Sequence, residues 1–177
     1  MFLKSAKSQF LIVLFPVVAF LIGCSENSLP PLHVTVGQPF PEFQMKGLQG
    51  DIVSSRRFNG KALIINIWAT WCSACRHELP SLQRLKNQLD PNKFVVFGIT
   101  VDKDVHLVKE YLIDRKITFP NYLDKNMTIS DGVLGVRLFP ATFLVKSDGT
   151  LANVIEGWRE WDNPELVAQI KSLNQKP

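Results

Sequence analysis

The chain has 177 residues, of which 46% are hydrophobic and 20% charged, as in an ordinary globular domain rather than a disordered or fibrous protein. Its net charge is +4, and two of its 20 basic residues, Lys4 and Lys7, precede every acidic residue. The rest of the chain therefore has 18 basic and 16 acidic residues. Such a mild balance, with no dense run of Lys and Arg, argues against nucleic acid as a partner. The length suits a single domain.

The first 23 residues differ in composition from the rest of the chain. Lys4 and Lys7 are followed by an uncharged stretch that ends at Gly23, and its apolar centre spans residues 10–22. A basic start, an apolar centre and a small residue at the end are typical of a secretory signal peptide. A membrane-spanning helix needs about 20 apolar residues, so an uncleaved anchor is the weaker interpretation. A buried core helix is disfavoured because the stretch has no polar face.

The end of this stretch, Leu21-Ile22-Gly23-Cys24, resembles the lipobox of bacterial lipoproteins, in which the cysteine becomes the lipidated first residue of the mature chain. The motif lies where cleavage is expected, and it gives a role to the odd one of three cysteines. We therefore expect residues 1–23 to be a lipoprotein signal peptide and Cys24 to carry the lipid, with an unmodified Cys24 as the alternative. Residues 24–34, polar and proline-containing, are then a tether.

Residues 35–177 predict one α/β domain, in which strands and helices alternate and then give way to a hairpin. The strand at 62–68 is apolar on both faces, as a central parallel strand should be. Leucines at helical spacing predict a helix that contains Pro80, which should kink it. The other expected elements are strands 43–46 and 51–53 around a tight turn, strand 94–101, helix 105–115, strands 141–145 and 151–155 around another turn, and a last helix capped by Asn163 with Pro164 at its first position.

The pair Cys72-Ser-Ala-Cys75 lies where the buried strand 62–68 leads into the helix. This spacing brings two sulfurs within disulfide reach across one helical turn. It places Cys72 at the helix N-terminus, where unpaired N–H groups and the helix dipole favour a thiolate. Cys72 is therefore the expected nucleophile, and the more shielded Cys75 the resolving thiol.

Two other interpretations of this pair are weaker. Half of a zinc site would need two more ligands, but there is no second Cys-x-x-Cys, and His33, His77 and His106 are the only histidines. We therefore predict no metal site. A permanent structural disulfide is the other alternative, although a three-residue step at a helix start makes a small, reactive ring. Redox catalysis by the disulfide itself, without another cofactor, is the favoured interpretation.

Three segments together resemble the TlpA/ResA/CcmG-type thioredoxin-like family: 36–43, 60–80, which includes Trp68-Ala-Thr-Trp-Cys-Ser-Ala-Cys75, and 139–145 with Phe139-Pro-Ala-Thr-Phe. The resemblance covers nearly the whole mature chain. It implies a thioredoxin-like fold, with a central mixed β-sheet flanked by helices and the N-terminal hairpin as an extension. Members are membrane-tethered bacterial proteins on the extracytoplasmic side, commonly reductases, and several serve cytochrome c maturation.

The resemblance assigns roles to three further residues. Pro140 occupies the place of the family's cis-proline beside the active-site disulfide, where the backbone meets substrate polypeptide as an added strand; an ordinary loop proline is the alternative. Glu78 matches an active-site acid that could exchange a proton with Cys75, against the alternative of a solvated helix glutamate. Trp71 would belong to the substrate-docking surface, although a packing role is equally defensible.

Two positions depart from the related patterns. Asn66 stands where ordinary thioredoxins carry a buried aspartate, so proton handling cannot follow that route and Glu78 gains importance. Ala74 stands where many relatives have proline, and the dipeptide between the cysteines helps to set the redox poise. Arg76 and His77 could stabilise the thiolate or simply face solvent.

The leading hypothesis is a lipid-anchored protein-disulfide reductase outside the cytoplasm, on the periplasmic face or the cell surface. Its partners would be protein disulfides, the membrane through the lipid on Cys24, and, by family analogy, a membrane thiol transporter as electron donor. An oxidase or isomerase would use the same residues with the opposite poise. A copper-handling protein would have a wider cysteine spacing and a distant histidine. A peroxidase would have a Thr-x-x-Cys arrangement, and position 69 is alanine.

Overall fold

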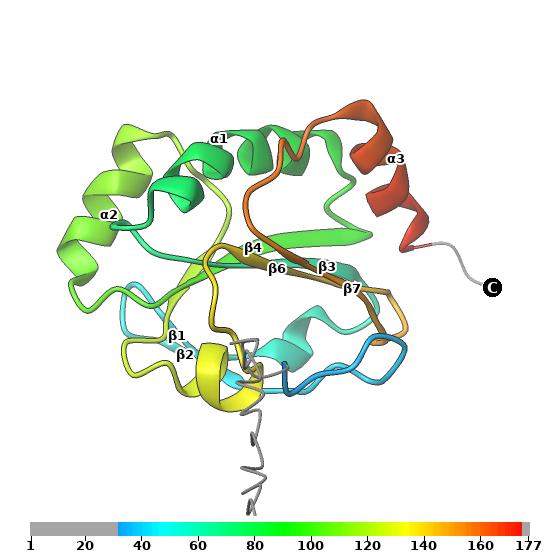
Figure 1. Cartoon of the computed structure of the whole chain (residues 1–177), viewed down its shortest axis with the longest axis horizontal. Coiled ribbons are helices and arrows are strands. Elements are labelled where there is room, and N and C mark those ends of the chain that lie inside the picture. Colours follow the sequence, from blue (N-terminus) through cyan, green and yellow to red (C-terminus); the bar gives the residue numbers. More distant parts are fainter. Residues whose placement is uncertain (1–31, 175–177) are drawn as a thin grey trace, which may run out of the picture.

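A computed structural model describes residues 32–174 (Figure 1). The core of the domain is a seven-stranded mixed sheet with strand order β2-β1-β5-β4-β3-β6-β7. The strands are β1 (Gln44–Gly47), β2 (Ile52–Ser54), β3 (Ala62–Trp68), β4 (Phe94–Thr100), β5 (Asn121–Leu123), β6 (Ala141–Val145) and β7 (Leu151–Glu156). The helices are η1 (Ser55–Phe58), α1 (Ser73–Gln88), α2 (Val105–Asp114), η2 (Thr128–Val133) and α3 (Pro164–Ser172).

The central strand β3 is buried along all seven residues, as its apolar sequence predicted. It pairs in parallel with β4 and antiparallel with β6. The parallel β3–β4 pair requires a crossover connection, which α1 supplies. The two predicted hairpins are also present, as the antiparallel pairs β1–β2 and β6–β7. The prediction of a thioredoxin-like mixed sheet with an N-terminal hairpin is therefore confirmed.

The three α-helices cover one face of the sheet, and the short helices η1 and η2 lie on the other face (Figure 1). Aromatic side chains fill the space beneath this second face: Phe58 stacks on Phe97 with ring centroids 5.3 Å apart, and Phe40 packs against Phe143 at 5.7 Å. Alternate residues of β3 point to opposite faces, so Asn66 faces α1 while its neighbours Ile65 and Ile67 face away from it.

Helix α1 continues through Pro80 as far as Gln88. Proline has no backbone N–H, so Pro80 leaves the carbonyl of Arg76 without its usual partner four residues later. The hydroxyl of Tyr111 on α2 donates a hydrogen bond to this carbonyl at 3.3 Å. The Tyr111 hydroxyl thus supplies a hydrogen bond to the carbonyl that Pro80 leaves without a backbone donor.

The predicted signal peptide, Cys24 and most of the predicted tether lie outside the described residues. The last tether residues are packed on the domain, because Leu32 and Val34 contact the core and the backbone N–H of His33 donates to the carbonyl of Leu134. Within residues 32–174, no helix combines the length and the apolar character that a membrane span requires.

Candidate functional site

The buried carboxylate of Asp102 holds the loop between β3 and α1 in place through hydrogen bonds. Asp102, just after β4, accepts hydrogen bonds from the backbone N–H of Thr70 at 2.8 Å and from its hydroxyl at 2.7 Å. The hydroxyl of Thr100 donates to the same carboxylate at 2.6 Å. Because β3 and β4 are parallel, their carboxyl ends meet at one edge of the sheet, and Asp102 there determines where the next residues of the loop lie.

Cys72 is the N-cap residue of α1, and Cys75 lies in the first turn. The two form a disulfide across this turn, with Cα atoms 5.3 Å apart. Cys72 keeps 8% of its surface exposed, whereas Cys75 is fully buried. The backbone N–H of Cys75 points at the Cys72 sulfur, 3.1 Å away, which is the contact that would stabilise a thiolate there after reduction. The order of exposure is the one that the sequence predicted.

The segment before β6 lies beside the cysteine loop. The Phe139–Pro140 peptide bond is cis, as the resemblance implied for this position. Trp71, which precedes Cys72, is 64% exposed and packs edge-on against Phe139 with ring centroids 5.7 Å apart. Leu138 is also exposed. An apolar surface therefore joins the cysteine loop to the cis-proline segment, and Trp71 has a solvent-facing position rather than a packing role in the core.

Glu78 is fully buried, so the alternative of a solvated helix glutamate is wrong. Its Oε1 accepts a hydrogen bond from Nδ2 of Asn66 at 2.6 Å. Its Oε2 accepts from the backbone N–H of Arg159 at 3.1 Å and from the indole N–H of Trp161 at 3.0 Å. Burial raises the pKa of Glu78 to about 7, although the hydrogen bonds from Trp161, Asn66 and Arg159 lower it in part. The carboxyl group is therefore poised to gain or lose a proton near neutral pH.

The two partners of Glu78 Oε2 come from the segment between β7 and α3, residues 157–163, which we call the β7–α3 segment. Ser81 on α1 accepts a hydrogen bond from the backbone N–H of Trp161 at 3.0 Å, and Arg84 forms ion pairs with Glu160 and Asp162. Further toward the cysteines, the exposed Trp158 packs edge-on against His77 at 4.7 Å. One face of α1 thus holds this segment along its length.

The sequence did not reveal Arg159, Trp161 or Asp102 as parts of the site. Trp161 lies 83 residues after Glu78, and Asp102 lies 32 residues after Thr70. No local spacing links such residues, because only the packing of the β7–α3 segment and of β4 brings them together. Arg76 and His77 are exposed, and His77 contacts Trp158.

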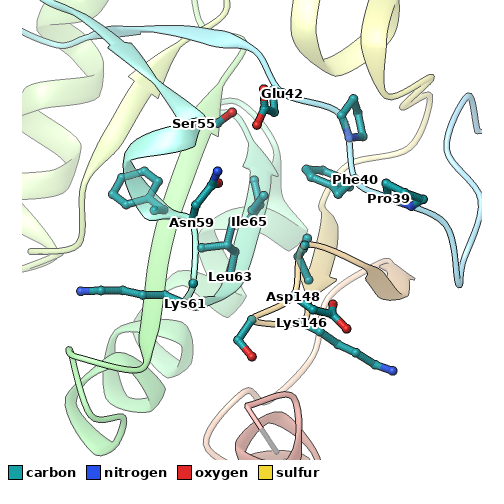
Figure 2. Close-up of a pocket in the computed structure, with 16 residues that line it drawn as sticks. Pro39, Phe40, Glu42, Ser55, Asn59, Lys61, Leu63, Ile65, Lys146 and Asp148 are labelled. Atoms are coloured by element: carbon teal, nitrogen blue, oxygen red, sulfur yellow. The ribbon is translucent and has the colours of Figure 1, made fainter. Parts of the chain in front are cut away.

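In residues 32–174, no three His, Cys, Asp or Glu side chains gather in a way that could hold a metal ion. A pocket of about 300 Å³ is remote from the cysteines. Figure 2 shows Leu63 and Ile65 of β3 between the Asn59 loop and Phe40. The pocket therefore lies toward the start of β3, whereas Cys72 follows the end of that strand.

The thioredoxin-like sheet, the cysteine pair at the start of α1 and the adjoining cis-proline define a thiol–disulfide oxidoreductase. The family model described as AhpC/TSA matches residues 36–154, and the chain belongs to this family. The thiol-disulfide oxidoreductase ResA of Oceanobacillus iheyensis is 26% identical over 155 residues, which are 85% of this chain and 80% of that protein. This similarity confirms the resemblance seen in the sequence.

Solved structures agree with this assignment. A thiol:disulfide interchange protein of the thioredoxin family from Chlorobium tepidum superposes with a TM-score of 0.67 at 28% identity, covering 80% of this chain and 99% of that one. A DsbF homologue from Corynebacterium diphtheriae gives a TM-score of 0.64 at 26% identity, covering 74% of this chain and 85% of that one.

Proposed function

We propose that this protein is a lipid-anchored reductase of protein disulfides that acts outside the cytoplasm. The observation that carries the proposal is the arrangement along α1: a slightly exposed Cys72 at the helix start, a buried Cys75 one turn in, and a buried Glu78 one turn further. This order separates a thiol that can meet a substrate from a thiol and an acid that cannot.

The reaction has two exchange steps. The Cys72 thiolate attacks a substrate disulfide, forming a mixed disulfide and releasing one substrate thiolate, which takes a proton from solvent. Cys75 then gives its proton to the Glu78 carboxylate and attacks the Cys72 sulfur. The Cys72–Cys75 bond forms and the second substrate thiolate leaves, so the substrate is reduced by two electrons and the pair is oxidised. A membrane dithiol donor, by family analogy a thiol transporter, restores the reduced pair.

The exposed Trp71 and the segment around Pro140 are the proposed docking surface. An extended substrate strand beside Pro140 would pair with backbone there, while Trp71 and Leu138 would cover its side chains. Cytochrome c maturation is the physiological role that the family resemblance suggests. The partner disulfides would then belong to proteins of that process.

A resolving-cysteine trap tests the central claim. The Cys75→Ala variant should accumulate mixed disulfides with substrate proteins, because nothing in the site can then displace them. Mass spectrometry would identify these adducts after non-reducing electrophoresis. An equal or larger yield from Cys72→Ala would contradict the assigned order of the two thiols.

The anchor is tested separately. Mass spectrometry of the protein purified from its native membrane should show residues 1–23 removed and a lipid on Cys24, because the lipobox-like sequence closes the apolar stretch. The matched variant Cys24→Ala should lack the lipid. An intact Met1 or an unmodified Cys24 in the native protein would refute the lipoprotein assignment without affecting the redox chemistry.

A further inference from the structure

The two oxygens of the Glu78 carboxyl group have different kinds of partner. Oε2 faces the backbone N–H of Arg159 and the indole N–H of Trp161, at 3.1 and 3.0 Å. Both groups donate and neither can accept. Within residues 32–174, the hydrogen-bond partner of Oε1 is the side-chain amide of Asn66 alone, at 2.6 Å. A proton on Oε2 would point at two other protons, so the acid form of Glu78 must carry its proton on Oε1.

Asn66 is the one of these three partners that can change its role. An amide presents either N–H or C=O, depending on how it is turned about its last side-chain bond. Its Nδ2 lies between Glu78 and the hydroxyl of Thr142, 2.9 Å away, and that hydroxyl can donate or accept. Its Oδ1 is buried without a hydrogen-bond partner among the described residues. A turn of the amide would place this unused acceptor where the Glu78 proton and the Thr142 hydroxyl can both reach it.

We propose that Asn66 is a positioning residue for the proton on Glu78: its amide donates to the carboxylate and turns over to accept from the carboxylic acid, whose proton always resides on Oε1. The inference deepens the proposed function and rests on it for the role of Glu78 in the resolution step. The transfer itself moves one proton from the Cys75 thiol to Oε1, with no change in electron count.

The charges around Glu78 allow this exchange near neutral pH. From β3 it meets the uncharged Asn66, which in turn bonds to the uncharged Thr142 of β6. From the β7–α3 segment it meets Trp161 and Arg159, and the charge of the Arg159 guanidinium lowers the pKa of Glu78. On its own helix, Cys75 lies one turn earlier, and His77 faces solvent. Burial raises the pKa of Glu78 to about 7, so both proton states are populated under physiological conditions.

The test is an NMR titration of the full chain in detergent micelles, with the disulfide intact, between pH 5 and 9. The side-chain amide signals of Asn66 should shift with the same midpoint as the carboxyl carbon of Glu78. The matched internal control is the amide of Asn121, which is also buried but bonds to Trp68 and to the carbonyl of Phe119. The Asn121 signals should stay constant.

Two variants sharpen the result. Glu78→Gln keeps the shape of the acid form and should abolish the titration of Asn66. Asn66→Ala removes a donor to the carboxylate and should raise the Glu78 midpoint by roughly half to one pH unit. Asn66 signals that stay flat while Glu78 titrates, or that still titrate in Glu78→Gln, would overturn the proposal. The titration requires no substrate, so it is independent of the proposed reductase activity, which an insulin-reduction assay measures. A protein in which Asn66 and Glu78 titrate together but which does not reduce insulin would contradict the proposed function and leave this inference intact.

Discussion

Glu78 is a carboxylic acid in a buried position, where its ionised form is destabilised. An ionised carboxylate without water is costly, and the three hydrogen bonds that it accepts offset only part of that cost. The result is an acid whose pKa is about 7 in the folded protein against 4.5 for the free side chain. Such a value suits a group that must receive a proton from a thiol and return it during each catalytic cycle.

The same pKa shift should make stability depend on pH. The folded state retains a proton that the unfolded chain releases above pH 4.5, so the stabilisation is complete below pH 4.5 and is lost as the pH rises through about 7. The loss should amount to about 3 kcal/mol by pH 8. Glu78→Gln, which stays neutral, should lack this loss in urea unfolding measured from pH 4.5 to 8. The exposed Glu110→Gln should behave as wild type, and parallel curves for all three proteins would contradict the prediction.

At the scale of single elements, the short loop between β3 and α1 determines where Cys72 lies. Its backbone is tied to β4 through Asp102, and α1 begins at Cys72 immediately afterwards. Helix α1 itself is tied to the β7–α3 segment by Glu78, Ser81 and Arg84. The helix that carries the cysteines is therefore held both at its start and along its length.

Asp102→Ala should reduce the free energy of unfolding by about 2–4 kcal/mol, because it leaves the N–H and hydroxyl of Thr70 buried without an acceptor. Asp102→Asn should cost less, since the amide oxygen still accepts from the Thr70 N–H and the Thr70 hydroxyl can accept in turn. Urea denaturation measures both variants. The exposed Asp114→Ala is the control and should change stability by less than about 0.5 kcal/mol. Equal effects of the alanine and asparagine variants at Asp102 would show that hydrogen bonding does not fix this loop.

At the scale of the whole molecule, the fold leaves an apolar surface exposed beside the cysteine loop and buries an acid on the helix that carries the two cysteines. Trp71 and Leu138 are exposed, whereas Glu78 of α1 and Asn66 of β3 are fully buried. In the proposed mechanism, a substrate would therefore reach Cys72 from solvent while Glu78 stays buried. The pocket near the start of β3 is too remote to take part in this chemistry.

The direction of the reaction is a property of the whole protein, and we expect the pair to be reducing. Its reduction potential should be nearer to the value of thioredoxin, about −270 mV, than to that of DsbA, about −120 mV. A carboxylate near the thiols disfavours a second negative charge and so destabilises a thiolate-based reduced form. Equilibration with glutathione buffers, followed by Trp71 fluorescence, measures the potential. A value well above about −180 mV would favour the isomerase or oxidase alternative instead.

The order of the main elements was readable from local patterns. Apolar runs predicted β3 and β4, leucines at helical spacing predicted α1, and Asn163 with Pro164 predicted the start of α3. The strand β5 and the helices η1 and η2 were not predicted, because three to six residues carry too little periodicity to indicate an element. β5 exists because its backbone pairs with β4 and β1.

By itself the sequence determined the redox pair, since two cysteines three residues apart at a strand-to-helix junction suffice to predict their proximity, their order of exposure and the nucleophile. The resemblance to the family also pointed to Glu78. Only the tertiary structure decided that this glutamate is buried and has a pKa near neutrality. The cause is physical: the water that would keep the acid ionised is excluded by the β7–α3 segment, whose donors lie 81 and 83 residues away and meet Glu78 only after the sheet has formed.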